Sequence, residues 1–244
     1  MKNLYIFLFL AFISLPIAIA QNEAAKPHYD KAVTLHRQGK TEEAIKELDE
    51  AVHSDKENID ALFERGVCKF DLGDFRGSEV DMLKCLKIND HHAKSYFYIG
   101  LCYLKAEYPT VATEYFSNAI KCDPSDYIYF YYRGVAICEL KSDYKFAQAD
   151  FEKAVELNPN HTDSYVYLGN IAFKFKDYQK ALSNDNKVLD LDPNYALAYF
   201  NLGMAYDALK DYTNACRSFN SALKLGYATA TEFADKACKK ASEN

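Results

Sequence analysis

Cysteine and histidine are the residues of this chain whose side chains could form a metal site, a disulfide or a nucleophile. The sequence contains seven cysteines and six histidines. No two cysteines have the CxxC spacing, and no two histidines form an HExxH motif. A structural zinc site normally takes its ligands from such closely spaced pairs. The sequence therefore predicts no metal site and no cofactor.

Most of the cysteines stand at small or apolar positions of the sequence pattern, which favours a role as small residues of a core. Cys68 and Cys102 are 34 residues apart, and Cys85 stands where Ala119 stands 34 residues later. One or two disulfides remain open as an alternative if the chain enters an oxidising compartment.

No arrangement of residues indicates catalysis. The chain lacks a glycine-rich phosphate loop, a GxSxG elbow and a recognisable Ser/His/Asp order. Its net charge is −6 without a basic stretch, which argues against nucleic acid as the main partner. We therefore predict that the protein is not an enzyme and has no catalytic residues.

A set of residues recurs about every 34 positions. This period divides the chain into repeated units, and each unit places its side chains in the same way. The recurring glycines Gly66, Gly100, Gly134, Gly169 and Gly203 are 34, 34, 35 and 34 residues apart. Within residues 93–126 the full set comprises Tyr96, Ile99, Gly100, Tyr103, Ala112, Phe116, Ala119 and Pro124.

This set matches the pattern of the tetratricopeptide repeat, aromatic-x2-Leu-Gly-x2-Tyr, then Ala-x3-Phe and Pro. The chain resembles proteins of that family. The resemblance implies an all-α fold, a right-handed α-solenoid of six helix-turn-helix repeats with a C-terminal capping helix over the end of the core. The predicted repeats are residues 25–58, 59–92, 93–126, 127–161, 162–195 and 196–229, and the capping helix is 230–242.

Three residues depart from the repeat pattern, and four aspartates are candidates to cap its second helices. Arg65 and Arg133 replace the leucine that usually precedes the glycine, and Asp185 stands where a large apolar residue is expected. An aspartate at the start of a second helix can accept hydrogen bonds from its free backbone N–H groups. The candidates for this capping role are Asp74, Asp143, Asp177 and Asp211.

The resemblance also implies where a partner binds. In this family the first helices of the repeats line a concave surface, and the fifth, ninth and twelfth residues of each repeat face inward. Here most of these residues are apolar or aromatic, which suits an extended or helical segment with large apolar anchors. The predicted groove residues are Phe63, Phe70, Phe97, Leu101, Leu104, Tyr131, Val135, Val166, Asn170, Phe173 and Phe200.

The predicted partner is a protein or a peptide, and the leading function is a non-enzymatic interaction scaffold. Family members that bind chaperone tails clamp a carboxylate with lysine, asparagine and arginine. The corresponding residues of the first three repeats are Tyr29, Val33, Glu64, Lys94 and Tyr98, so the clamp is absent. The alternative function is a structural, self-associating envelope component whose ends stack on other copies.

Residues 1–20 have the order of a secretory signal peptide. Lys2 precedes an apolar run from Leu4 to Leu15, and Ala18-Ile19-Ala20 precedes Gln21. The run is shorter than the roughly 20 apolar residues that a membrane-spanning helix needs. We expect cleavage after Ala20, no stable membrane insertion afterwards, and a periplasmic or secreted protein of bacterial type. An uncleaved N-terminal membrane anchor is the alternative.

Overall fold

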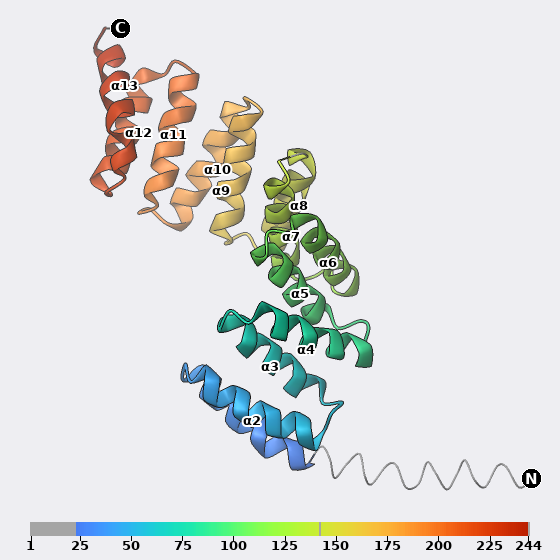
Figure 1. Cartoon of the computed structure of the whole chain (residues 1–244). Coiled ribbons are helices and arrows are strands. Elements are labelled where there is room, and N and C mark those ends of the chain that lie inside the picture. Colours follow the sequence, from blue (N-terminus) through green and yellow to red (C-terminus); the bar gives the residue numbers. More distant parts are fainter. Residues whose placement is uncertain (1–22, 142, 244) are drawn as a thin grey trace, which may run out of the picture. The chain divides into compact units, whose positions relative to one another are not determined.

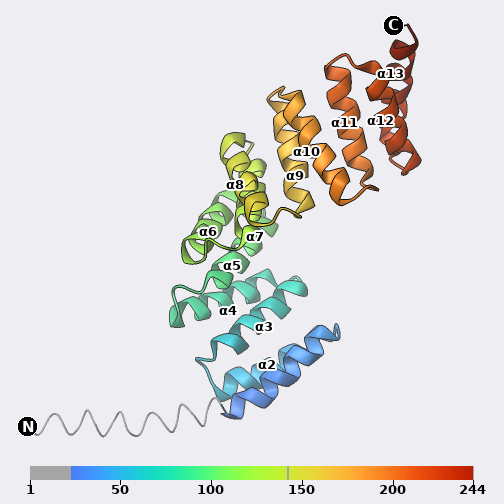
Figure 2. The same ribbon diagram turned by 180° about the vertical axis from the view of Figure 1, so that it is seen from behind.

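The computed structural model describes residues 23–141 and 143–243, and these residues form helices joined by short turns (Figure 1 and Figure 2). The predicted signal peptide and its cleavage site lie outside the described residues. Within the described ranges no strand occurs, and the expected all-α fold is confirmed. None of the described helices has both the length and the apolar character needed to cross a bilayer.

The chain divides into two compact halves, one ending at Pro124 and one beginning at Ser125. The N-terminal half contains a helix over residues 23–37 and then α2 (Thr41–Ser54), α3 (Ile59–Asp71), α4 (Phe75–Ile88), α5 (Ala93–Lys105) and α6 (Pro109–Cys122). The C-terminal half contains α7 (Tyr127–Glu139), α8 (Tyr144–Leu157), α9 (Thr162–Lys174), α10 (Tyr178–Leu191), α11 (Ala196–Ala208), α12 (Tyr212–Lys224), a 3-10 turn (Ala228–Ala230) and α13 (Thr231–Glu243).

Consecutive helices pack as pairs, such as α5 with α6 and α11 with α12 (Figure 1). Small residues let the two helices of a pair approach closely. A Cβ added to Gly203 would lie 2.5 Å from the ring of Phe219, and one added to Gly100 would lie 2.6 Å from Phe116. In these two pairs the phenylalanine ring of the second helix therefore rests directly on the backbone of the first.

The turn inside each pair contains one residue in the left-handed backbone region. Glycine fills this place in the first two repeats, and a charged residue fills it in the next four. A residue with a Cβ atom pays roughly 1–2 kcal/mol for this conformation, so the later turns are strained. The residues are Gly39, Gly73, Glu107, Lys141, Lys176 and Lys210, with φ of 76°, 81°, 63°, 53°, 63° and 65°.

Three of the four expected aspartate caps are present. Asp74 accepts a hydrogen bond from the backbone N–H of Gly77 at 2.8 Å, and Asp177 and Asp211 accept equivalent bonds at 3.1 Å. Asp143 makes no side-chain cap on α8. It follows the turn that is one residue longer, and its backbone φ of −133° differs from the values near −80° at the other three caps.

The two unusual arginines are matched by aspartates on the second helix of the same pair. Arg65 binds the buried carboxylate of Asp81 through two nitrogens, at 2.7 and 2.9 Å. Arg133 binds Asp150 in the same way, at 2.6 and 2.8 Å. In each pair the arginine supplies the two donors that the aspartate needs in order to be buried.

The last described helix, α13, packs against α12 in the C-terminal half (Figure 1). It buries Ala234 and Ala237. A disulfide between Cys216 of α12 and Cys238 of α13 joins the two helices. The other five cysteines are free thiols, three of them buried. One disulfide therefore forms, and Cys216 and Cys238 have a covalent role that their apolar positions alone did not indicate.

Candidate partner-binding site

In the N-terminal half, the predicted groove residues on α3 and α5 are held by contacts among aromatic rings. Phe63 and Phe70 both pack edge-on against Tyr98, with ring centroids 5.5 and 5.6 Å away. Phe97 packs at 5.8 Å on Phe116 and so joins the surface to the core. Leu104 is half-buried, whereas Leu101 is only 9% exposed and offers little surface to a partner.

In the C-terminal half, the predicted residues divide into a buried group and an accessible group. Val166 is 9% exposed, and Tyr131 packs against Phe151 and the ring of His161. Val135 is half-buried beside the core of α8. Burial raises the pKa of the Tyr131 hydroxyl, so this phenol stays neutral.

The remaining predicted residues, Asn170, Phe173 and Phe200, come together around one pocket. It has a volume of about 190 Å³ and lies among α9, α10 and α11. The ring of Phe200 packs against the rings of Phe219 in α12 and Phe233 in α13. The complete lining consists of Gly169, Asn170, Phe173, Asp185, Phe200, Asn201 and Met204.

Asp185 creates this pocket because it replaces a larger side chain. In three of the other repeats the ring of Phe116, Phe151 or Phe219 fills the space over the glycine of the first helix. In the fifth repeat, Asp185 faces Gly169 instead, and a Cβ added to this glycine would lie 3.0 Å from a carboxylate oxygen. A carboxylate is smaller than a phenyl ring, so part of the space stays open.

Asp185 is 1% exposed, and few protein groups offset the cost of burying its carboxylate. The amide nitrogen of Asn201 donates to one of its oxygens over a long 3.4 Å. Among the described residues no lysine, arginine or histidine forms an ion pair with it. Burial raises the pKa of Asp185 to about 7, and the hydrogen bond from Asn201 only partly opposes this.

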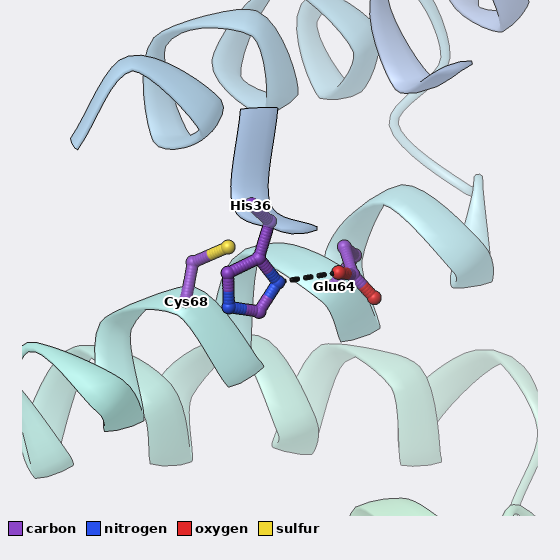
Figure 3. Close-up of side chains that lie close together, drawn as sticks. All are labelled: His36, Glu64 and Cys68. Atoms are coloured by element: carbon purple, nitrogen blue, oxygen red, sulfur yellow. Dashed lines mark hydrogen bonds and ion pairs between the residues drawn. The ribbon is translucent and has the colours of Figure 1, made fainter. Parts of the chain in front are cut away.

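A second group of polar side chains joins the first helix to α3. In Figure 3 the imidazole of His36 lies between Glu64 and Cys68. Its Nδ1 is 2.8 Å from Glu64, and its Nε2 is 2.9 Å from Asp71. Burial lowers the pKa of His36, but the hydrogen bonds and charges of Glu64 and Asp71 outweigh it, and the net result is a raised pKa.

The potential ligand atoms of His36, Glu64 and Cys68 lie within 4.8 Å of one another, close enough to consider a metal ion. Burial, with the charges of Glu64 and Asp71, raises the pKa of Cys68 to about 12, so in the metal-free protein its thiol keeps its proton. A metal would need the thiolate and a free imidazole nitrogen. Both imidazole nitrogens already face carboxylates, which favours an ion-paired histidine.

Family models of the tetratricopeptide repeat match residues 22–81, 131–161, 150–183 and 186–217. Together these segments cover more than half of the chain. The protein belongs to the tetratricopeptide-repeat family. The expectation drawn from the recurring glycines and aromatic residues is therefore confirmed, and the family supports the general role of a protein-interaction scaffold.

Among curated proteins, the chain is similar to tetratricopeptide repeat protein 16 of Macaca fascicularis and of Homo sapiens, with 25% and 24% identity over 159 residues. The matched part is 62% of this chain but only 18% of each relative.

Several solved structures share the fold. YrrB, described as a TPR protein with an unusual peptide-binding site, is 22% identical with a TM-score of 0.68, over 79% of this chain and 97% of that one. PilF of Pseudomonas aeruginosa is 17% identical with a TM-score of 0.76, over 88% and 99% of the two chains. MamA of Desulfovibrio magneticus RS-1 is 23% identical with a TM-score of 0.65, over 72% and 99%.

Sequence reasoning placed Asn170, Phe173 and Phe200 in a common surface but missed Asp185 as part of it. The signal was present, because Asp185 breaks the apolar pattern of its position. What the sequence did not show was whether a nearby cation would neutralise the aspartate, as Arg65 does for Asp81.

Proposed function

We propose that this protein is an exported, non-enzymatic scaffold that binds an extended segment of a partner protein along the first helices of its repeats. The observation that carries the proposal is the convergence of Asn170, Phe173 and Phe200 on one pocket. These residues come from two successive first helices, α9 and α11. A partner segment that crosses both helices would meet aromatic surface and amide groups there.

Export is supported by two independent features. Residues 1–20 have the order of a cleaved signal peptide, and the Cys216–Cys238 disulfide is of a kind that persists in oxidising compartments. Mass spectrometry of the protein recovered from a bacterial host should give a chain that begins at Gln21. A chain that keeps residues 1–20 and stays with the membrane would favour the anchored alternative.

Peptide binding is best tested by selecting peptides from a random display library on the purified protein. The affinity of the selected peptides is then measured for the wild type and for Phe97→Ala/Phe173→Ala, which changes one first helix in each half. We expect the double variant to bind at least about fivefold more weakly, the loss typical of an interface anchor.

Phe146→Ala is the matched control, because Phe146 is a phenylalanine on the second helix α8 with 66% of its surface exposed. It should leave the affinities unchanged, and circular dichroism should show the same helix content for every variant. The proposal fails if no peptide is enriched, or if the double variant binds the selected peptides as tightly as the wild type.

The alternative of end-to-end stacking has weaker support. Helix α13 ends the described chain and exposes Glu232, Asp235, Lys236 and Lys239. A polar outer face of this kind is typical of a cap that keeps an array soluble. Light scattering should therefore give a mass that does not rise with protein concentration.

A further inference from the structure

The pocket at Asp185 has a chemical character that goes beyond a general peptide-binding surface. Of its seven lining residues only Asp185 is ionisable. A buried carboxylate without a cation is costly, and proteins normally pair it or keep it protonated. The five equivalent positions in the other repeats hold the apolar residues Leu48, Met82, Phe116, Phe151 and Phe219, all buried. The fold therefore does not require an acid here.

The walls of the pocket suit an organic cation on an alkyl stem. Phe173, Phe200 and Met204 supply apolar and aromatic surface, and aromatic faces attract ammonium groups. Asn170 is exposed at the surface, whereas Asp185 is buried, so a side chain entering beside Asn170 would reach the carboxylate with its end. The volume of about 190 Å³ is sufficient, since a cavity of roughly 150 Å³ already takes up benzene.

We propose that this pocket binds the ammonium group of a lysine side chain in the partner segment, with Asp185 as its counter-ion. The amide of Asn201 already donates to one carboxylate oxygen, at 3.4 Å. The arrangement therefore favours a compact ammonium group over a guanidinium fork, which needs both oxygens. The lysine's origin in a peptide rests on the proposed function, whereas the affinity of the pocket for an ammonium group does not.

The protonation of Asp185 gives this binding a pH dependence. Its pKa is about 7 in the empty pocket because the carboxylate is buried, and no other lining residue titrates. The carboxylate must be charged to hold an ammonium group. Affinity should therefore rise between pH 6 and pH 8 and should be several-fold lower at pH 5.5 than at pH 8.

The test uses the full chain labelled with ¹³C at its methionine methyl groups. The sequence has three methionines, of which Met204 lines the pocket and Met82 is buried in the N-terminal half as an internal control. The probe is Nα-acetyl-lysine methylamide, and the neutral comparison is the norleucine analogue. We expect the lysine probe to shift the Met204 signal saturably while the Met82 signal stays constant, and the norleucine analogue to have little effect.

Three variants identify the group responsible. Asp185→Asn keeps the shape of the side chain and should weaken binding of the lysine probe roughly 30-fold or more. Asp185→Phe restores the packing seen at Phe219, and should close the pocket while raising the melting temperature. Asp190→Asn removes an exposed charge from the same helix, α10, and should leave binding unchanged.

Equal shifts from the lysine and norleucine probes, or unchanged binding by Asp185→Asn, would overturn the proposal. Tighter binding of the arginine analogue would overturn the choice of lysine. If free 1,5-diaminopentane binds more tightly than the lysine probe, the proposal that the bound ammonium group belongs to a peptide is overturned. If display selection yields groove-binding peptides but Met204 does not respond, the scaffold function stands and the lysine pocket fails.

Discussion

Lys210 adopts a left-handed backbone conformation, with φ of 65°, at the turn between α11 and α12. Gly73 fills the same place between α3 and α4 without strain. We predict that Lys210→Gly raises the free energy of unfolding by about 0.5–1 kcal/mol, because relief of strain exceeds the added entropy of the unfolded chain. Urea denaturation of the two proteins measures the difference.

The reverse change, Gly73→Ala, is the natural companion experiment. An added Cβ at this position meets no atom within 4 Å, so any loss of stability comes from the backbone conformation alone. The same denaturation should show a loss of about 1 kcal/mol. If Lys210→Gly destabilises while Gly73→Ala is neutral, the left-handed turns do not carry the strain described above.

Single positions also show where sequence reasoning reached its limit. The recurring glycines were sufficient to indicate helix pairs. The ring of Phe219 leaves no room for a Cβ atom at Gly203, so the glycine marks the contact between the two helices. Arg65 and Asp185 both break the same apolar pattern, yet one is paired and the other is not. That difference depends on which side chain lies across the helix contact, and the repeat pattern alone does not give it.

At the scale of elements, His36 joins the helix over residues 23–37 to α3 through Glu64 and Asp71. Its pKa is raised in the folded protein. The stability that it contributes is therefore fully present below its unfolded pKa, about 6.5, and is lost as pH rises through the higher folded value. We predict that His36→Gln lowers stability by about 1 kcal/mol or more at pH 5.5.

The difference between wild type and His36→Gln should shrink toward pH 8.5, because the imidazole loses its charge as pH rises through its raised folded pKa. Guanidinium denaturation at the two pH values, followed by circular dichroism, gives the measurement. His53→Gln is the matched control, because His53 is exposed on α2. A difference that is the same at both pH values would show that the charge of His36 does not hold these helices together.

The disulfide between α12 and α13 closes a loop of 22 residues. We predict that Cys216→Ser/Cys238→Ser lowers the stability of the C-terminal helices by roughly 2–4 kcal/mol. Thiol titration of the unfolded, oxidised protein should give five free thiols, and seven after reduction. Seven thiols before reduction would contradict the disulfide.

Across the whole molecule, repeat arrays are stabilised mainly by contacts between neighbouring helices. Ala181 is 1% exposed where α10 packs on α9. We predict that Ala181→Leu overpacks this contact, costs about 1–3 kcal/mol, and accelerates hydrogen exchange mainly in α9, α10 and α11. Amides of α3 and α4 serve as the internal control. Equal acceleration in both halves would instead indicate one cooperative unit.

The family and the all-α fold followed from a period of 34 residues because such a period leaves little architectural choice. The repeat pattern predicts only part of the surface that a partner would contact. Leu101 and Val166 occupy groove positions by number but are buried by their neighbours. The Cys216–Cys238 bond depends on how α13 folds back on α12, and no residue of the repeat pattern determines that angle.

The ion pairs inside the repeats have a consequence for folding fidelity. Lys31 with Glu47, Arg65 with Asp81 and Arg133 with Asp150 occur in the first, second and fourth repeats. In the third repeat the corresponding residues are Ile99 and Tyr115. If α3 docked on α6 in place of α4, Arg65 would meet Tyr115, and Asp81 would lose its main counter-ion. We therefore expect the charges to favour docking of α3 on α4 over docking on α6.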